Sequence, residues 1–110
     1  MLGELVKIRV SQFNGCAFCL RMHTRDALKL GESSDRLAVL AAWWESQYFS
    51  ELESAALALA EEVTQFEVPP SRAEDTAVLS AEQVSAISWL AIVMNSWNRS
   101  AIRSQYPVAP

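Results

Sequence analysis

The sequence predicts an all-helical protein, and three observations support this fold class. Only three glycines and four prolines occur in 110 residues, and most of them stand between helical segments. Apolar residues recur at helical spacing over long stretches. No segment alternates apolar and polar residues for long enough to predict a strand. We therefore expect a single domain over residues 1–110, built as a bundle of about five to six helices.

Three helices are predicted in the first half of the chain. The first covers about residues 2–13 and ends at the Asn-Gly pair of residues 14–15, because both residues tolerate a left-handed backbone. The second covers about residues 16–30, and Gly31 follows as its natural end. A run of Ser and Asp then offers caps for a third helix over about residues 33–44.

Two capping boxes mark the helices of the second half. One starts at Ser50 and opens a helix to about Gln65, and the other starts at Ser80 and opens a long helix to about Ser104. Between them a pair of prolines breaks the chain, and a short turn or helix is expected through Val78.

The long last helix is apolar almost all round between Val84 and Trp97. Such a helix lies either at the centre of a core or between subunits. A lone domain of this size buries only about 60–65% of its unfolded surface. We therefore favour a subunit interface and a homo-oligomer.

Charge and apolar runs exclude several classes of partner. The net charge is −4 and no cluster of Lys or Arg occurs, so we expect no nucleic acid and no anionic membrane as partner. The longest apolar run, residues 86–94, is far shorter than a membrane span, and the first residues lack the pattern of a signal peptide. We expect a cytoplasmic protein, where two cysteines are more often redox-active or metal-binding than structural.

The chemistry is predicted by Cys16 and Cys19, a CxxC pair, with His23 four residues further on. Offsets of three, four and seven fall on one face of a helix, so the three side chains can share a site. The Cα atoms of such a cysteine pair lie about 5–6 Å apart, within disulfide range. The start of a helix lowers the pKa of a thiol, which favours Cys16 as the nucleophile, whereas the helical phase brings only Cys19 next to the histidine.

Other interpretations of these residues are open from the sequence alone. The cysteines can be small core residues, or they can bind zinc together with His23 and Glu4. His23 can be a surface histidine and Glu4 a solvated helix residue. The aromatic cluster of residues 43–49 fits core or subunit packing better than the wall of a substrate pocket.

The spacing of these residues resembles a known family signature. Glu4 is followed by eleven residues and then by C-x-x-C-x-x-x-H, which ends at His23. This pattern resembles that of the alkylhydroperoxidase D (AhpD) branch of the carboxymuconolactone decarboxylase superfamily. The segment at residues 43–51 resembles its W-x-E-S-x-x-F-S-E motif, and residues 95–99 resemble its N-x-W-N-R motif. The likeness spans about residues 2–104.

The resemblance implies an AhpD-like helical bundle, a trimer or hexamer, that reduces hydroperoxides. Cys19 would be the peroxidatic thiol, Cys16 the resolving thiol, and Glu4 and His23 a proton relay. The redox-active disulfide would need no bound cofactor or metal, and a dithiol or lipoyl-type protein would reduce it. Known members usually carry a second histidine where this chain has Phe18, and further helices before the Glu, which we expect to be missing here.

Two other functions remain open beside peroxide reduction. One is a redox sensor or disulfide-exchange protein without peroxidase turnover. The other is the decarboxylase or lactonase chemistry of the wider superfamily, against which the pair of thiols argues, because that chemistry has no evident need of two thiols.

Overall fold

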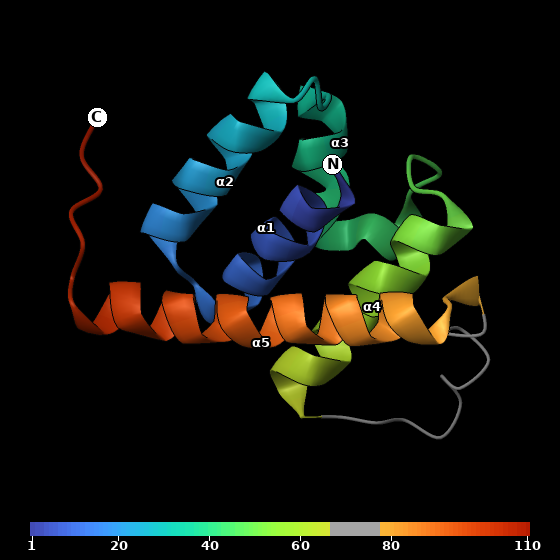
Figure 1. Cartoon of the computed structure of the whole chain (residues 1–110). Coiled ribbons are helices and arrows are strands. Elements are labelled where there is room, and N and C mark those ends of the chain that lie inside the picture. The colour runs from blue at the N-terminus through green and yellow to red at the C-terminus, as the bar shows by residue number, and fades with distance from the viewer. Residues whose placement is uncertain (67–77) are drawn as a thin grey trace.

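A computed structural model describes residues 1–66 and 78–110 of the chain (Figure 1). Within these ranges all regular secondary structure is helical, which confirms the predicted fold class. The elements, in chain order, are α1 (Leu2–Asn14), α2 (Ala17–Lys29), α3 (Ser34–Val39), the 3₁₀ helix η1 (Leu40–Glu45), α4 (Glu51–Gln65) and α5 (Ala81–Arg103).

Helix α1 is the central element, since it contacts α2, α4 and α5. Its apolar side chains belong to two separate hydrophobic clusters on different sides of the helix. Val6 and Val10 join a cluster with residues of α4 and α5 and both cysteines. Leu5 and Ile8 join a second cluster with residues of α2, η1 and α4. Because α1 is packed on several sides, its residues next to the CxxC motif have fixed positions.

Helix α5 crosses α1 and α4 on the outside of the bundle (Figure 1). Its buried residues follow a helical stripe: Ile87, Ala91, Met94, Asn98 and Ala101. On its other side Trp89 and Trp97 are 64% and 59% exposed. Of the two placements that the sequence allows for this helix, the centre of the core does not hold for the isolated chain, because α1 takes that place, and the favoured subunit interface stays a prediction. In the part of the chain that the structure describes, no helix combines the length and apolarity that crossing a bilayer requires.

The predicted capping boxes are confirmed at both positions. The side chain of Ser50 accepts a hydrogen bond from the backbone N–H of Glu53, whose carboxylate accepts one from the backbone N–H of Ser50 in return. Ser80 and Gln83 make the same reciprocal pair at the start of α5. These local bonds satisfy backbone donors that helix starts leave unpaired.

The prediction of one helix over about residues 33–44 is wrong in one respect. The helical backbone is interrupted at Ala42, whose φ of −129° and ψ of 41° are not helical, so a short α-helix is followed by a kinked 3₁₀ segment. Leu40 is fully buried in this segment, and Trp43 packs against the same cluster as Leu40. Packing of these side chains overrides the continuous helix that the sequence favours. Most of the turn or helix expected before Val78 lies outside the described residues.

Candidate active site

The turn between α1 and α2 fixes the position of Cys16. Gly15 has a left-handed backbone, with φ 67° and ψ 34°. Its N–H bonds to the carbonyl of Gln12, and the N–H of Cys16 bonds to the carbonyl of Ser11 at 3.1 Å. This pair of bonds is a Schellman motif, which closes α1. Cys16 is therefore at once the residue after the cap of α1 and the N-cap of α2.

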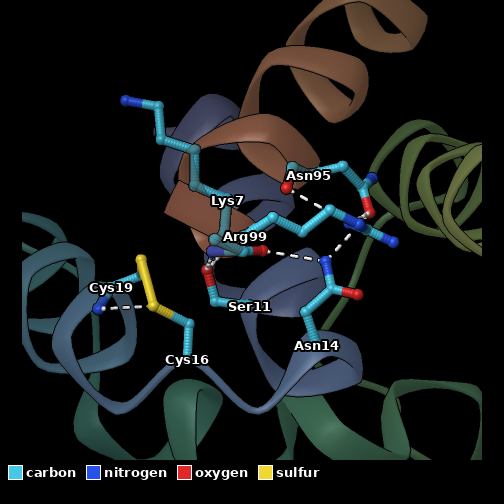
Figure 2. The surroundings of a disulfide bond; sticks show 8 residues. Lys7, Ser11, Asn14, Cys16, Cys19, Asn95 and Arg99 are labelled. Atoms are coloured by element: carbon cyan, nitrogen blue, oxygen red, sulfur yellow. Dashed lines mark hydrogen bonds between the residues drawn. A yellow bond between two sulfur atoms is a disulfide. The ribbon is translucent and has the colours of Figure 1, made fainter. Parts of the chain in front are cut away.

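Cys16 and Cys19 are joined by a disulfide, with their Cα atoms 5.3 Å apart (Figure 2). The Sγ atom of Cys16 also accepts a hydrogen bond from the backbone N–H of Cys19 at 3.3 Å. Both residues are almost fully buried. The pair thus occupies the first turn of a helix, where backbone N–H groups and the helix dipole favour negative charge on sulfur.

Glu4 on α1 meets His23 on α2. One carboxylate oxygen of Glu4 lies 3.1 Å from Nδ1 of His23, and the other accepts a hydrogen bond from Nζ of Lys7 at 2.7 Å. The side chains of Glu4 and His23 are only 12% and 10% exposed. The structure therefore brings two of the predicted site residues into direct contact, and adds a lysine that the sequence analysis did not single out.

The environment of Glu4 keeps its carboxyl ionised. Burial on its own raises the pKa of this group, but the hydrogen bond and the charge of Lys7, together with His23, outweigh burial and bring the pKa of Glu4 below its ordinary value. An ionised carboxylate can only accept hydrogen bonds, so Nδ1 of His23 must be the donor. In a neutral imidazole Nε2 is then the proton acceptor. Glu4 thus sets which nitrogen of His23 can act as a base.

An apolar cavity of about 420 Å³ lies beside Cys19 and His23. Side chains of α1, α2, α5 and the segment after α5 surround it: Lys7, Phe18, Cys19, Met22, His23, Leu90, Val93, Met94, Trp97, Ala101 and Tyr106. Its size and lining suit a small apolar molecule with one polar end directed at the cysteine and histidine.

Cys16 faces a different and smaller cavity of about 200 Å³, between the start of α2 and the chain after α5. Phe18 and Tyr106 border both cavities, and their rings meet edge to face with centroids 5.1 Å apart. The two cysteines therefore border different cavities, and the Phe18–Tyr106 pair borders both of these cavities.

The four residues that zinc binding would use do not form one metal site in this structure, since the two sulfurs are bonded to each other. Zinc requires thiolates as sulfur ligands. Ligand atoms of Glu4, His23 and Asp26 do lie within 4.8 Å of one another. Because Lys7 already binds Glu4, that carboxylate is compensated by a cation within the protein.

The aromatic cluster predicted for packing is confirmed in part. Trp43 and Phe49 pack against the second hydrophobic cluster, and Nε1 of Trp43 donates to Glu61 at 2.7 Å. Trp44 is 59% exposed and Tyr48 is 50% exposed. The cavity beside Cys19 is lined by other aromatic residues of the chain, so this cluster is not its wall.

Sequence reasoning missed several residues around the site. Lys7 stands three residues after Glu4, a spacing that predicts a helical ion pair and could have identified it. Asn98 was noted only as part of a motif, although its side chain is fully buried. Tyr106 follows the last helix and carried no signal of a role in the site.

Comparison with known proteins agrees with this architecture. A profile described as "Carboxymuconolactone decarboxylase family" matches residues 2–62. The chain is 44% identical over 105 residues to YdfG of Bacillus subtilis (strain 168), an uncharacterised protein, and the match covers 90% of this chain and 70% of YdfG. A crystal structure from Agrobacterium tumefaciens, titled as a protein of unknown function and a candidate antioxidant defence protein AhpD, matches with a TM-score of 0.84 and 32% identity. That match covers 98% of this chain and 78% of the other. The chain belongs to the carboxymuconolactone decarboxylase family, in its AhpD-like branch.

Proposed function

We propose that this protein is a thiol peroxidase that reduces alkyl hydroperoxides through a dithiol–disulfide cycle of Cys16 and Cys19. One observation carries the proposal: Cys19 and His23 line the same apolar cavity, and His23 is hydrogen-bonded to an ionised Glu4. A nucleophilic thiol, a base with a defined tautomer and an apolar pocket are the parts that hydroperoxide reduction needs.

The proposed cycle balances in three steps. His23 accepts the proton of the Cys19 thiol at Nε2, and the thiolate attacks the terminal oxygen of ROOH. The O–O bond breaks, the alkoxide takes a proton and leaves as ROH, and Cys19 becomes a sulfenic acid. The Cys16 thiol then loses its proton and attacks the Cys19 sulfur, and the departing hydroxide takes up a proton to leave as water. An external dithiol finally reduces the disulfide and is itself oxidised to a disulfide.

The assignment of Cys19 as the peroxidatic residue is supported by the positions of the cavities. Cys16 is the N-cap and lies nearest the positive end of the helix, which favours its thiolate. Yet among the cavities formed by the described residues Cys16 borders the smaller one, where His23 takes no part in the lining. The leaving alkoxide needs a proton donor next to the reacting sulfur, and His23 follows Cys19 by one helical turn.

We further propose that the protein works as a homo-oligomer, with trimer or hexamer favoured, and in the cytoplasm, where dithiols are available. The exposed apolar side of α5, with Trp89, Ile92, Val93 and Trp97 on its surface, supports a contact between copies. The reductant would be a dithiol or lipoyl-type group, because the second thiol of such a group resolves the mixed disulfide within the same molecule.

Stopped-flow oxidation of the reduced protein by several hydroperoxides, with thiol counting, tests the proposal. Cys16→Ser should react once and leave a trappable sulfenic acid on Cys19. Cys19→Ser should lose this single reaction, and neither variant should turn over. A sulfenic acid on Cys16 in the Cys19→Ser protein would reverse the assignment of the two thiols.

Steady-state turnover separates the proposal from the two other functions. A redox sensor or disulfide-exchange protein would be oxidised once by peroxide and would show no sustained consumption with an excess of dithiol. Decarboxylase or lactonase chemistry would persist in the Cys16→Ser and Cys19→Ser variants, since that chemistry does not use the disulfide. Sustained peroxide consumption that both substitutions abolish is the result that we expect.

A further inference from the structure

A chain of buried and half-buried polar side chains connects α5 to the end of α1, next to the disulfide (Figure 2). The amide nitrogen of Asn98 donates to the Ser11 hydroxyl at 3.0 Å, and its amide oxygen accepts from the amide nitrogen of Asn14 at 2.9 Å. The Ser11 hydroxyl donates in turn to the carbonyl of Lys7 at 2.7 Å. Asn98 and Ser11 are both fully buried.

This arrangement satisfies the polar atoms that it buries. Burying an amide or a hydroxyl is costly unless each is hydrogen-bonded, and a small apolar residue would fill the same space without that demand. A fully bonded network of this kind fixes one relative placement of the elements that it joins. The elements joined here are α5 and the last turn of α1.

The network continues through the backbone to Cys16. The carbonyl of Ser11, whose side chain is held by Asn98, accepts the hydrogen bond from the N–H of Cys16 at 3.1 Å. Ser11 is therefore the one residue through which these hydrogen bonds link Asn98 to Cys16. The disulfide itself adds the bond from the N–H of Cys19 to the Cys16 sulfur. The position of one sulfur is thus coupled to α5, while Cys19 is placed by α2.

We propose that Asn98 and Ser11 are positioning residues that hold Cys16 in reach of Cys19 and so set the effective concentration of the Cys16 thiol. Closing the disulfide costs less entropy when the Cys16 turn is already held in place. Loosening the turn leaves the rate at which Cys19 reacts with an oxidant unchanged. It lowers both the equilibrium constant and the rate of disulfide formation. The inference rests on the proposed dithiol–disulfide cycle, but not on a peroxide as its oxidant.

The chain offers a closely matched control in Thr64. Its hydroxyl accepts from the amide nitrogen of Asn95 on α5 at 3.1 Å and donates to the carbonyl of Ala60, four residues earlier on its own helix, at 2.7 Å. The Ser11 hydroxyl accepts from an α5 asparagine and donates to the carbonyl four residues before it in the same way. The Thr64 hydroxyl, however, joins α4 to α5 and has no bond to Ser11 or Asn98; its partner Asn95 reaches α1 through Asn14, whose amide nitrogen donates to the Asn95 oxygen at 2.9 Å.

The first test is the equilibrium between the dithiol and the disulfide in glutathione buffers, compared for wild type, Ser11→Ala, Asn98→Leu and Thr64→Val. In this reaction oxidised glutathione is reduced to two thiols while the Cys16–Cys19 bond forms. We expect the equilibrium constant to fall about tenfold in Ser11→Ala, as the loss of one buried hydrogen bond implies. A tenfold change equals a shift of about 30 mV in reduction potential. Thr64→Val should change it less than about twofold.

Urea unfolding shows whether Ser11→Ala and Thr64→Val cost similar stability, so that a general loosening is separated from an effect on Cys16. In stopped-flow experiments with hydroperoxide, Ser11→Ala should keep the rate of Cys19 oxidation and slow disulfide formation about tenfold. If Asn98→Leu does not fold, Ser11→Ala alone carries the test. No shift in Ser11→Ala, or an equal shift in Thr64→Val, would overturn the inference. Because the glutathione equilibrium uses no peroxide, it decides this inference even if the protein reduces none.

Discussion

Replacing Glu4 with Gln isolates the contribution of its charge to the reaction of Cys19. Gln retains the shape of the side chain and an oxygen that can accept the hydrogen bond from Nδ1 of His23, so the tautomer of the imidazole is preserved. What disappears is the negative charge that stabilises the imidazolium formed when His23 accepts a proton. The 3.1 Å contact and the low exposure of both side chains mean that water screens this charge poorly.

The size of the effect follows from the contact. A hydrogen bond that involves a charged group contributes about 1.5–3 kcal/mol. If this energy is realised only when His23 is protonated, the second-order rate constant for oxidation of Cys19 falls about 10- to 100-fold. The loss should shrink at higher pH, where hydroxide ionises the thiol without His23. Single-turnover stopped-flow measurements between pH 5 and 10 provide the test.

Lys7→Met is the matched control for this variant. Removing Lys7 takes away the hydrogen bond and charge that lower the pKa of Glu4, so burial raises that pKa. The acid limb of the pH–rate profile should therefore move to higher pH, while the rate on the neutral plateau changes little as long as Glu4 remains ionised there. An unchanged profile in Glu4→Gln would refute the reasoning, because Glu4 would then be only a structural residue of α1.

Three further predictions concern assembly and stability. Trp89→Glu places a charge on the exposed apolar side of α5 and should convert the oligomer to a monomer in sedimentation at micromolar concentration; a well-folded wild-type monomer would contradict the proposed assembly. Glu61→Ala leaves Arg9, which donates to Glu61 at 2.8 Å, buried without its counter-ion, so urea unfolding should show a loss of about 3 kcal/mol. Although burial raises the pKa of Glu53, its hydrogen bonds to Arg36 and the helix cap and the charge of Arg36 lower it on balance. The stability from this ionisation is therefore present above the ordinary pKa of 4.5 and lost as pH falls through the lowered value. Glu53→Gln should flatten the acid side of the stability profile, and an unchanged slope would contradict this.

The helices and their ends can be predicted from the sequence wherever the hydrogen bonds that define them are local. The Asn-Gly stop after α1 and the capping boxes at Ser50 and Ser80 involve residues within five positions of each other, so they can be predicted from the spacing along the chain. The grouping of Cys16, Cys19 and His23 could also be predicted, because they lie within seven positions of each other and share one helical face. Within residues 1–66 and 78–110, packing replaces a locally favoured helix with a kinked segment at Ala42.

Tertiary structure decided which residues meet across helices. The contact of Glu4 with His23 depends on how α1 and α2 pack, and the closure of the cavity by Trp97 and Tyr106 depends on where α5 crosses them. The hydrogen bond from Asn98 to Ser11 joins residues that lie far apart in the chain. Helical periodicity predicts which face of a helix is apolar, but several crossing angles and rotations bury the same faces equally well. The choice among them is made by the whole set of packed side chains, which spacing along the chain does not specify.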